Sequence, residues 1–81
     1  MMNDTKPTKT LDYYLSLLYP ILFTPSEEGG FVVSIPILRG CLSQGDDLQE
    51  AYVMVQEAKE LWLEVAFESH LPIPEPESER M

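Results

Sequence analysis

Histidine, cysteine and basic side chains are scarce in this sequence of 81 residues. It contains one histidine, His70, and one cysteine, Cys41, and only five lysine and arginine residues against fourteen acidic ones. These counts exclude an internal disulfide and a histidine-based metal cluster. Cys41 is expected to pack as a small buried hydrophobe, and a lone thiol is typical of a reducing compartment.

Long apolar runs are also missing. The stretch that comes nearest to one, residues 11–23, is too short to span a bilayer, and Asp12 and Pro20 interrupt it. No small-residue cleavage site follows it, as a signal peptide would require. The sequence therefore predicts a cytoplasmic protein without a membrane segment.

Motifs for catalysis are absent as well. No serine stands in a GxSxG motif, and Gly29-Gly30 lacks the lysine and the helix start of a phosphate-binding loop. Carboxylates do recur along one helical face, at Glu57, Glu60 and Glu64, but such a spacing is usual for a solvated face. We expect no enzyme, no cofactor and no metal site, and hence a binding module.

What the sequence has in excess is negative charge. The formal net charge is −9 and the pI is about 4.2. Such a surface repels the phosphates of nucleic acids and attracts a basic partner. Acidity that only improves solubility is the alternative.

Two short apolar runs surround a turn and predict an antiparallel hairpin. Residues 19–24 form the first run and residues 31–35 the second, with acidic residues and Gly29-Gly30 between them. Residues 41–44 are long enough for a third strand, which Gly45 is expected to end. Both strands of the hairpin have apolar residues on both faces, so we expect a second cover beyond one helix, supplied either by the N-terminal segment or by another chain.

Residues 48–68 predict one long helix. Asp47 stands at the capping position and Glu50 follows three residues later. At 100° per residue, one face carries a broad apolar set: Leu48, Ala51, Tyr52, Val55, Ala58, Trp62, Val65 and Ala66. Met54, Leu61 and Leu63 widen it, so the stripe fits either a core with wide margins or a core plus a self-association surface.

The two ends of the chain have weaker patterns. Thr10 is a possible helix cap before Leu11, Leu15 and Leu18, although an early strand is the alternative for this segment. After the long helix, prolines at 72, 74 and 76 predict an extended segment in which Ile73 docks on the domain. We expect tails at residues 1–10 and 77–81 and one domain over residues 11–76.

The order of several short motifs resembles the HicB antitoxin family. They run from Tyr19-Pro20 through Glu27-Glu28-Gly29-Gly30-Phe31, Ile35-Pro36-x-Leu38-x-Gly40-Cys41, Gln44-Gly45-Asp46, Glu50-Ala51, Ala58-Lys59 and Trp62 to Ile73-Pro74-Glu75-Pro76. Two positions depart from the family pattern. Arg39 replaces a proline before Gly40, and Ser69-His70 replaces an Asp-Gly that ends the helix in a left-handed conformation.

The resemblance implies a fold and a function. The fold is α+β: a small antiparallel sheet packed on one long helix, in the order β-β-β-α-β described as degenerate RNase H-like or ferredoxin-like. The implied function is an antitoxin that binds a small basic HicA-like toxin, an mRNA-cleaving protein, and covers its active or RNA-binding surface. An orphan interaction module without a toxin is the alternative. Many family members carry a further DNA-binding domain after this one; it is not expected here, so neither is direct DNA binding.

Candidate contact residues follow from charge and from surplus apolar surface. Glu27, Glu28, Glu75 and Glu77 are the predicted toxin contacts, because they lie in a loop and in the C-terminal segment. Met54, Leu61 and Val32 are predicted to mediate self-association into a dimer or a larger homo-oligomer, as family members tend to do.

Overall fold

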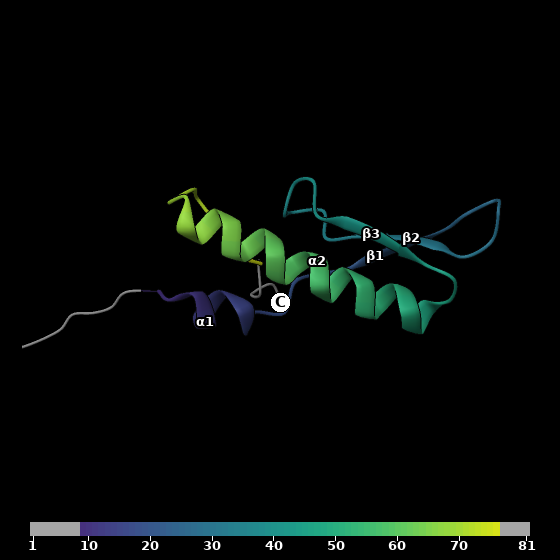
Figure 1. The fold of residues 1–81 in the computed structure, drawn as a ribbon, viewed down its shortest axis with the longest axis horizontal. Helices are drawn as coiled ribbons and strands as arrows, with labels where there is room; N and C mark the ends of the chain where they lie inside the picture. The colour runs from purple at the N-terminus through teal and green to yellow at the C-terminus, as the bar shows by residue number, and fades with distance from the viewer. Residues whose placement is uncertain (1–8, 77–81) are drawn as a thin grey trace, which may run out of the picture.

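The computed structural model describes residues 9–76 and has an α+β fold, as predicted (Figure 1). Its elements are α1 (Leu11–Leu15), β1 (Leu22–Pro25), β2 (Phe31–Ser34), β3 (Leu42–Gly45) and α2 (Leu48–Glu68). The sheet lies over the first part of α2, and α1 runs beside its last turns (Figure 1). The N-terminal segment is thus a helix, with the Thr10 side chain accepting a hydrogen bond from the Tyr13 amide at 3.2 Å.

The three strands form an antiparallel sheet in the order β1-β2-β3. Phe23, Val33 and Ser43 stand side by side in its register. The predicted hairpin is confirmed, but β1 begins at Leu22 rather than at Tyr19, after Pro20, which has no N–H for a strand ladder. β3 continues through Gly45, where the sequence predicted a break, because Gly45 pairs with Phe31.

The start of α2 has the predicted cap. The Glu50 amide donates to Asp47 Oδ1 at 2.8 Å, and Glu50 Oε1 accepts from the Asp46 amide at 2.5 Å. The returning bond reaches the residue before the cap instead of the cap itself. Two amides at the positive end of the helix are therefore satisfied by acidic side chains.

The end of α2 turns through His70, which has a φ of 58°. The Leu71 amide then donates to the Ala66 carbonyl at 2.9 Å, so the chain reverses although no glycine is present. Residues 71–76 return along α1 without forming a strand, so the last strand that the resemblance implied is absent from this part of the chain. Prolines at 72, 74 and 76 explain this, since they lack N–H donors.

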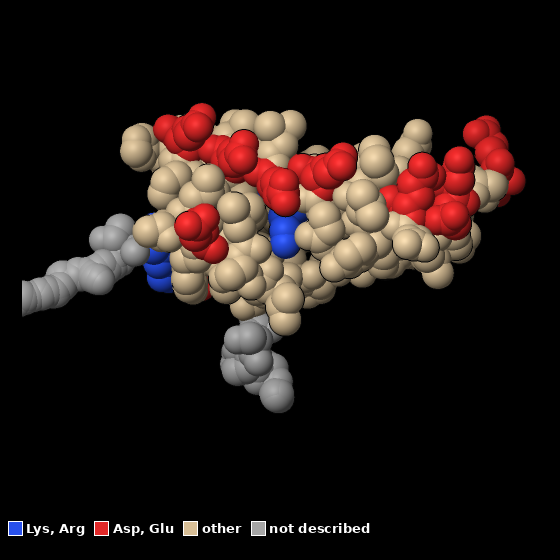
Figure 2. All heavy atoms as spheres, turned by 60° about the horizontal axis from the view of Figure 1, so that its bottom comes forward, with Lys and Arg blue, Asp and Glu red and all other residues tan. Residues whose placement is uncertain are grey.

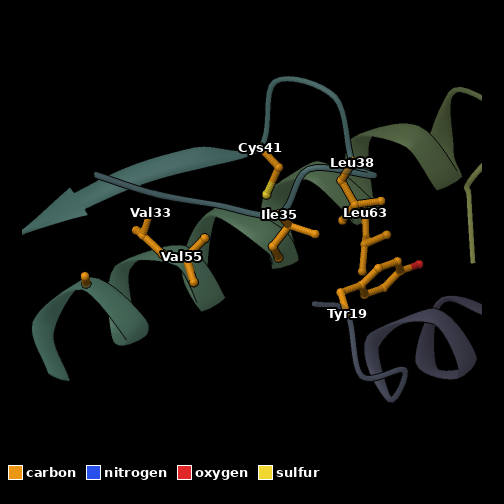
Figure 3. Packing of buried hydrophobic residues seen from close by; sticks show 8 residues of the cluster. Tyr19, Val33, Ile35, Leu38, Cys41, Val55 and Leu63 are labelled. Carbon is orange, nitrogen blue, oxygen red and sulfur yellow. The ribbon is translucent and has the colours of Figure 1, made fainter. Parts of the chain in front are cut away.

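The core lies between the sheet and α2 and is closed at one end by Tyr19 (Figure 3). Val33, Ile35, Leu38, Val55 and Leu63 are fully buried. Tyr19 donates a hydrogen bond from its hydroxyl to the Pro74 carbonyl at 2.7 Å, and Ile73 packs against the same core, as predicted. The C-terminal segment is thereby fixed to the domain.

The buried face of α2 is rotated from the predicted one. Leu63, predicted at the margin of the stripe, is fully buried, whereas Val65, on the opposite margin, is about half exposed. Leu48 and Tyr52 are also about half exposed, but they belong to the first two turns of α2 and lie on the same side as Leu63. The reason is that α1 and residues 71–76 pack against the last turns of α2 and cover the side on which Leu63 lies.

Lys59 lies in the centre of this buried face. It is only 9% exposed and stands one turn from both Val55 and Leu63. It lines a hollow of about 160 Å³ between α2 and the segment joining α1 to β1. Its methylene groups thus pack in the core while its ammonium group has a route to water.

Candidate functional site

Acidic side chains gather on the side of α2 that faces away from the sheet. At 100° per residue, Glu57, Glu60, Glu64 and Glu68 fall on one arc of the helix, and all four are exposed. We call these four residues the acidic ridge. Figure 2 shows red acidic atoms following the length of the molecule on one face. A ridge of negative charge attracts a positively charged surface.

The ridge continues past the start of α2 towards the hairpin. Asp46 and Glu50 are exposed beside the first turn, and the predicted contacts Glu27 and Glu28 are exposed in the turn between β1 and β2. A groove between that turn and α2 is lined by Glu28, Asp46 and Glu50 together. The structure therefore brings the hairpin acids and the helix-start acids to one end of the domain.

Glu75 lies elsewhere and is already bonded within the chain. Its carboxylate accepts from Lys9 Nζ at 2.6 Å and from the Tyr13 hydroxyl at 2.9 Å. The hydrogen bond from Lys9, then that from Tyr13, holds the pKa of the Glu75 carboxyl below its ordinary value. Glu75 thus joins the C-terminal segment to α1, and the remaining predicted contact, Glu77, lies outside the described residues.

The sequence indicated the acidic ridge but not its use. The spacing of Glu57, Glu60 and Glu64 was visible, yet it was interpreted only as a solvated helix face. The missing information was how far this face extends. Only the fold shows that it runs on into the helix start and the hairpin turn, elements that are separate in the sequence.

The described residues contain little that could perform chemistry. In residues 9–76, no three His, Cys, Asp or Glu side chains are grouped so as to hold a metal ion. Cys41 is 3% exposed, and burial raises the pKa of its thiol, which keeps it protonated and unreactive. Within the same range, no helix is both long and apolar enough to cross a membrane.

The predicted self-association residues are all at the surface. Met54, Leu61 and Val32 are 37%, 63% and 42% exposed. Met54 and Leu61 share the flank of α2 on the β3 side, whereas Val32 lies on the sheet face away from α2 together with Leu22 and Leu42. The second cover expected for the hairpin is therefore not supplied by residues 9–76.

Comparison with known proteins places this domain in a family. Residues 19–80 match the family described as HicB_like antitoxin of bacterial toxin-antitoxin system. A UPF0150 protein of Synechocystis sp. is 46% identical over 61 residues, which cover 75% of this chain and 84% of that protein. A UPF0150 protein of Thermoplasma acidophilum is 32% identical over 63 residues, 78% of this chain and 91% of the relative.

A longer relative carries the antitoxin name. Antitoxin HicB 1 of Photorhabdus laumondii is 39% identical over 61 residues, which make up 75% of this chain but 39% of that antitoxin. The match thus covers less than half of the longer protein. Since the family match spans most of the described fold and the resemblance predicted from the sequence agrees with it, the chain belongs to the HicB-like antitoxin family.

Proposed function

We propose that this protein is an antitoxin that binds a small, basic, mRNA-cleaving toxin of the HicA type and covers its active or RNA-binding surface. Membership of the HicB-like family supports the class of partner. The observation that carries the proposal is the acidic surface that runs from the ridge on α2 to Glu27 and Glu28. A toxin that binds RNA must present positive charge, and this surface matches it.

The protein acts in the cytoplasm by binding alone, without catalysis. An RNA-binding surface recognises phosphates, and a row of carboxylates on a rigid helix offers charges of the same sign. The four ridge glutamates lie on successive turns of α2, so they hold their spacing without the toxin. Glu27 and Glu28, on a turn closed by the bond from the Ser26 amide to the Gly30 carbonyl at 3.0 Å, extend the same surface.

Self-association is the second part of the proposal. Exposed apolar side chains on the β3 flank of α2 and on the outer sheet face exceed what the domain buries by itself. A homodimer or a larger homo-oligomer would cover them. The acidic ridge occupies the neighbouring arc of α2, so the two interfaces would adjoin along the helix.

Co-expression tests the proposal most directly. The partner is the product of a neighbouring reading frame that encodes a short, basic, histidine-containing protein. We expect this product to arrest growth when expressed alone and to be neutralised and co-purified when this chain is present. A neighbour of that kind that neither binds nor is neutralised would contradict the proposal and favour an orphan interaction module.

Charge reversal locates the interface. Glu60→Lys on the ridge is expected to weaken toxin binding about 10-fold, equivalent to about 1.4 kcal/mol. Asp12→Lys on α1 changes the net charge equally and serves as the matched control. Titration calorimetry at low and high salt checks both variants, since affinity should fall with salt. Equal losses in the two variants, or binding unaffected by salt, would contradict recognition by the ridge.

A further inference from the structure

The free edge of β3 is the starting point. β3 lies at one end of the strand order β1-β2-β3, so within residues 9–76 only β2 pairs with it. The Ile35 amide donates to the Cys41 carbonyl at 3.0 Å, which makes 35 and 41 a hydrogen-bonded pair. Because such pairs alternate along an antiparallel ladder, Ser43 bonds towards β2 while Leu42 and Gln44 direct their N–H and C=O groups to the open edge. An unpaired edge of this kind is a template for another strand.

A groove opens between β3 and α2 at one end of this edge. At Gly45 the helix touches the strand, since a Cβ there would lie 2.4 Å from the Ala51 nitrogen. Towards Leu42 the two elements separate around a hollow of about 580 Å³. Its lining is mainly apolar and includes Leu61, Val65 and Leu71, which are 63%, 51% and 55% exposed.

One cation stands beside this apolar groove. Arg39 lines it, and the Arg39 carbonyl accepts a hydrogen bond from Trp62 Nε1 at 2.9 Å, which fixes the loop before β3. The opposite end of β3 carries two acids, Asp46 and Asp47. A positively charged residue therefore stands before β3 in the chain, and two negatively charged residues stand directly after it.

A second copy of the chain fits this arrangement when the strands run antiparallel. With a twofold axis at Ser43, Leu42 of each copy hydrogen-bonds Gln44 of the other through both backbone groups, so all edge groups of β3 are paired. This register sets Arg39 opposite Asp47 and next to Asp46 of the second copy. It also brings the first turn of that copy's α2, with Leu48 at 53% exposure, towards the groove. A parallel arrangement would instead set Arg39 against itself.

We propose that two copies of this chain pair through β3 in antiparallel fashion, giving one six-stranded sheet, with the first turn of each α2 seated at the groove of the other copy. The inference deepens the self-association part of the proposed function and shares only the helix-start acids, Asp46 above all, with the surface proposed for the toxin. The acidic ridge lies on another arc of α2 and stays accessible to a toxin in this dimer.

Molar mass measured by light scattering across a concentration series tests the pairing. The unmodified chain is expected at twice 9.3 kDa. Arg39→Asp and Asp46→Arg should each weaken dimerisation at least about 10-fold, and the double variant should restore it, because the two charges exchange places. Asp46 caps through its backbone amide, so its side chain is free for substitution. Asp12→Arg, which changes the net charge as Asp46→Arg does, should leave the mass unchanged.

Hydrogen exchange on the unmodified chain provides a second readout. The amides of Leu42 and Gln44 should be protected at high concentration and exchange faster on dilution or in Arg39→Asp. A monomer at every concentration, a dimer that both reversals leave intact, or a double variant that stays monomeric would overturn the inference. Toxin binding measured on Arg39→Asp separates this failure from failure of the proposed function, since the monomer should still bind the toxin.

Discussion

The two flanks of α2 differ in what the chain places against them. On one flank, α1 and residues 71–76 cover the helix, with the Tyr19 hydroxyl bonded to Pro74 and the ring of Tyr14 centred 6.4 Å from that of Phe67. On the other, between α2 and β3, Leu61 remains 63% exposed beside an open groove. The chain thus uses α1 and residues 71–76 to bury one flank, while the described residues leave the other open.

The largest expected effect is on stability and distinguishes a buried from an exposed leucine of α2. Leu63→Ala removes a fully buried side chain and should lower the free energy of unfolding by about 2–5 kcal/mol, through lost burial and a residual cavity. Leu61→Ala, two residues away on the open flank, should change it by less than about 1 kcal/mol. Urea unfolding of monomeric protein measures both, and similar losses would mean that the open flank is packed in solution.

A smaller effect on the free energy of unfolding is expected from the hydrogen bond that joins Tyr19 to Pro74 on the covered flank. Tyr19→Phe removes the hydrogen bond to Pro74 and should cost about 0.5–1.5 kcal/mol at pH 7, whereas Tyr52→Phe, half exposed, should cost almost nothing. Urea unfolding at pH 7 tests this pair. If the two substitutions had equal effects, the Tyr19 bond would not stabilise the covered flank.

The same bond should respond to alkaline pH. Burial raises the pKa of Tyr19 from 10.0 to about 12. The contribution of neutral Tyr19 to the free energy of unfolding is therefore complete below pH 10. It is lost as the pH rises towards 12, because the Tyr19 hydroxyl of the unfolded chain ionises at a lower pH than that of the folded chain. The difference between the unmodified chain and Tyr19→Phe should shrink accordingly above pH 10.

The smallest effect concerns the exposed end of the covered flank. The pKa of Glu75 is lowered by Lys9 and Tyr13, so its bonds are present above the ordinary carboxyl pKa of 4.5 and are lost as the pH falls through the lower folded-state value. NMR titration of the Glu75 carboxyl should show the depressed pKa at low salt and a partial return in 1 M salt. A Glu75 that titrates at 4.5 or above in low salt would refute this connection between α1 and the C-terminal segment.

Local signals in the sequence were sufficient for most of the fold. The cap at Asp47 and the hairpin turn at Gly29-Gly30 each depend on a few neighbouring residues, so they could be predicted. The left-handed position at His70 was implied only by the family resemblance, because no glycine marks it.

The rotation of the buried face of α2 could not be predicted. It depends on where α1 and residues 71–76 pack. Helical periodicity does place Lys59 between Val55 and Tyr52, but the charge of a lysine gives no reason to expect it to be buried.

The candidate site was less predictable because it combines distant segments. The sequence marked Glu27 and Glu28 as exposed loop acids, but their continuity with the ridge on α2 exists only once β3 pairs with β2 and brings the start of α2 to the hairpin turn. In the sequence, Glu75 is an acidic residue in a proline-containing segment outside the long helix, as Glu27 and Glu28 are. Its partners Lys9 and Tyr13 lie more than 60 residues earlier in the chain, so no local pattern distinguishes it.

Gly45 sets the shape of a surface that it does not itself line. Because Gly45 has no Cβ, the strand backbone can approach the backbone of Ala51 more closely than any other residue would allow: a Cβ there would lie 2.4 Å from the Ala51 nitrogen. Away from this contact the two elements separate, and the groove opens between them near Leu42. A methyl group added at position 45 would therefore push β3 and the first turn of α2 apart. The groove would change shape near Leu42, although position 45 does not line it.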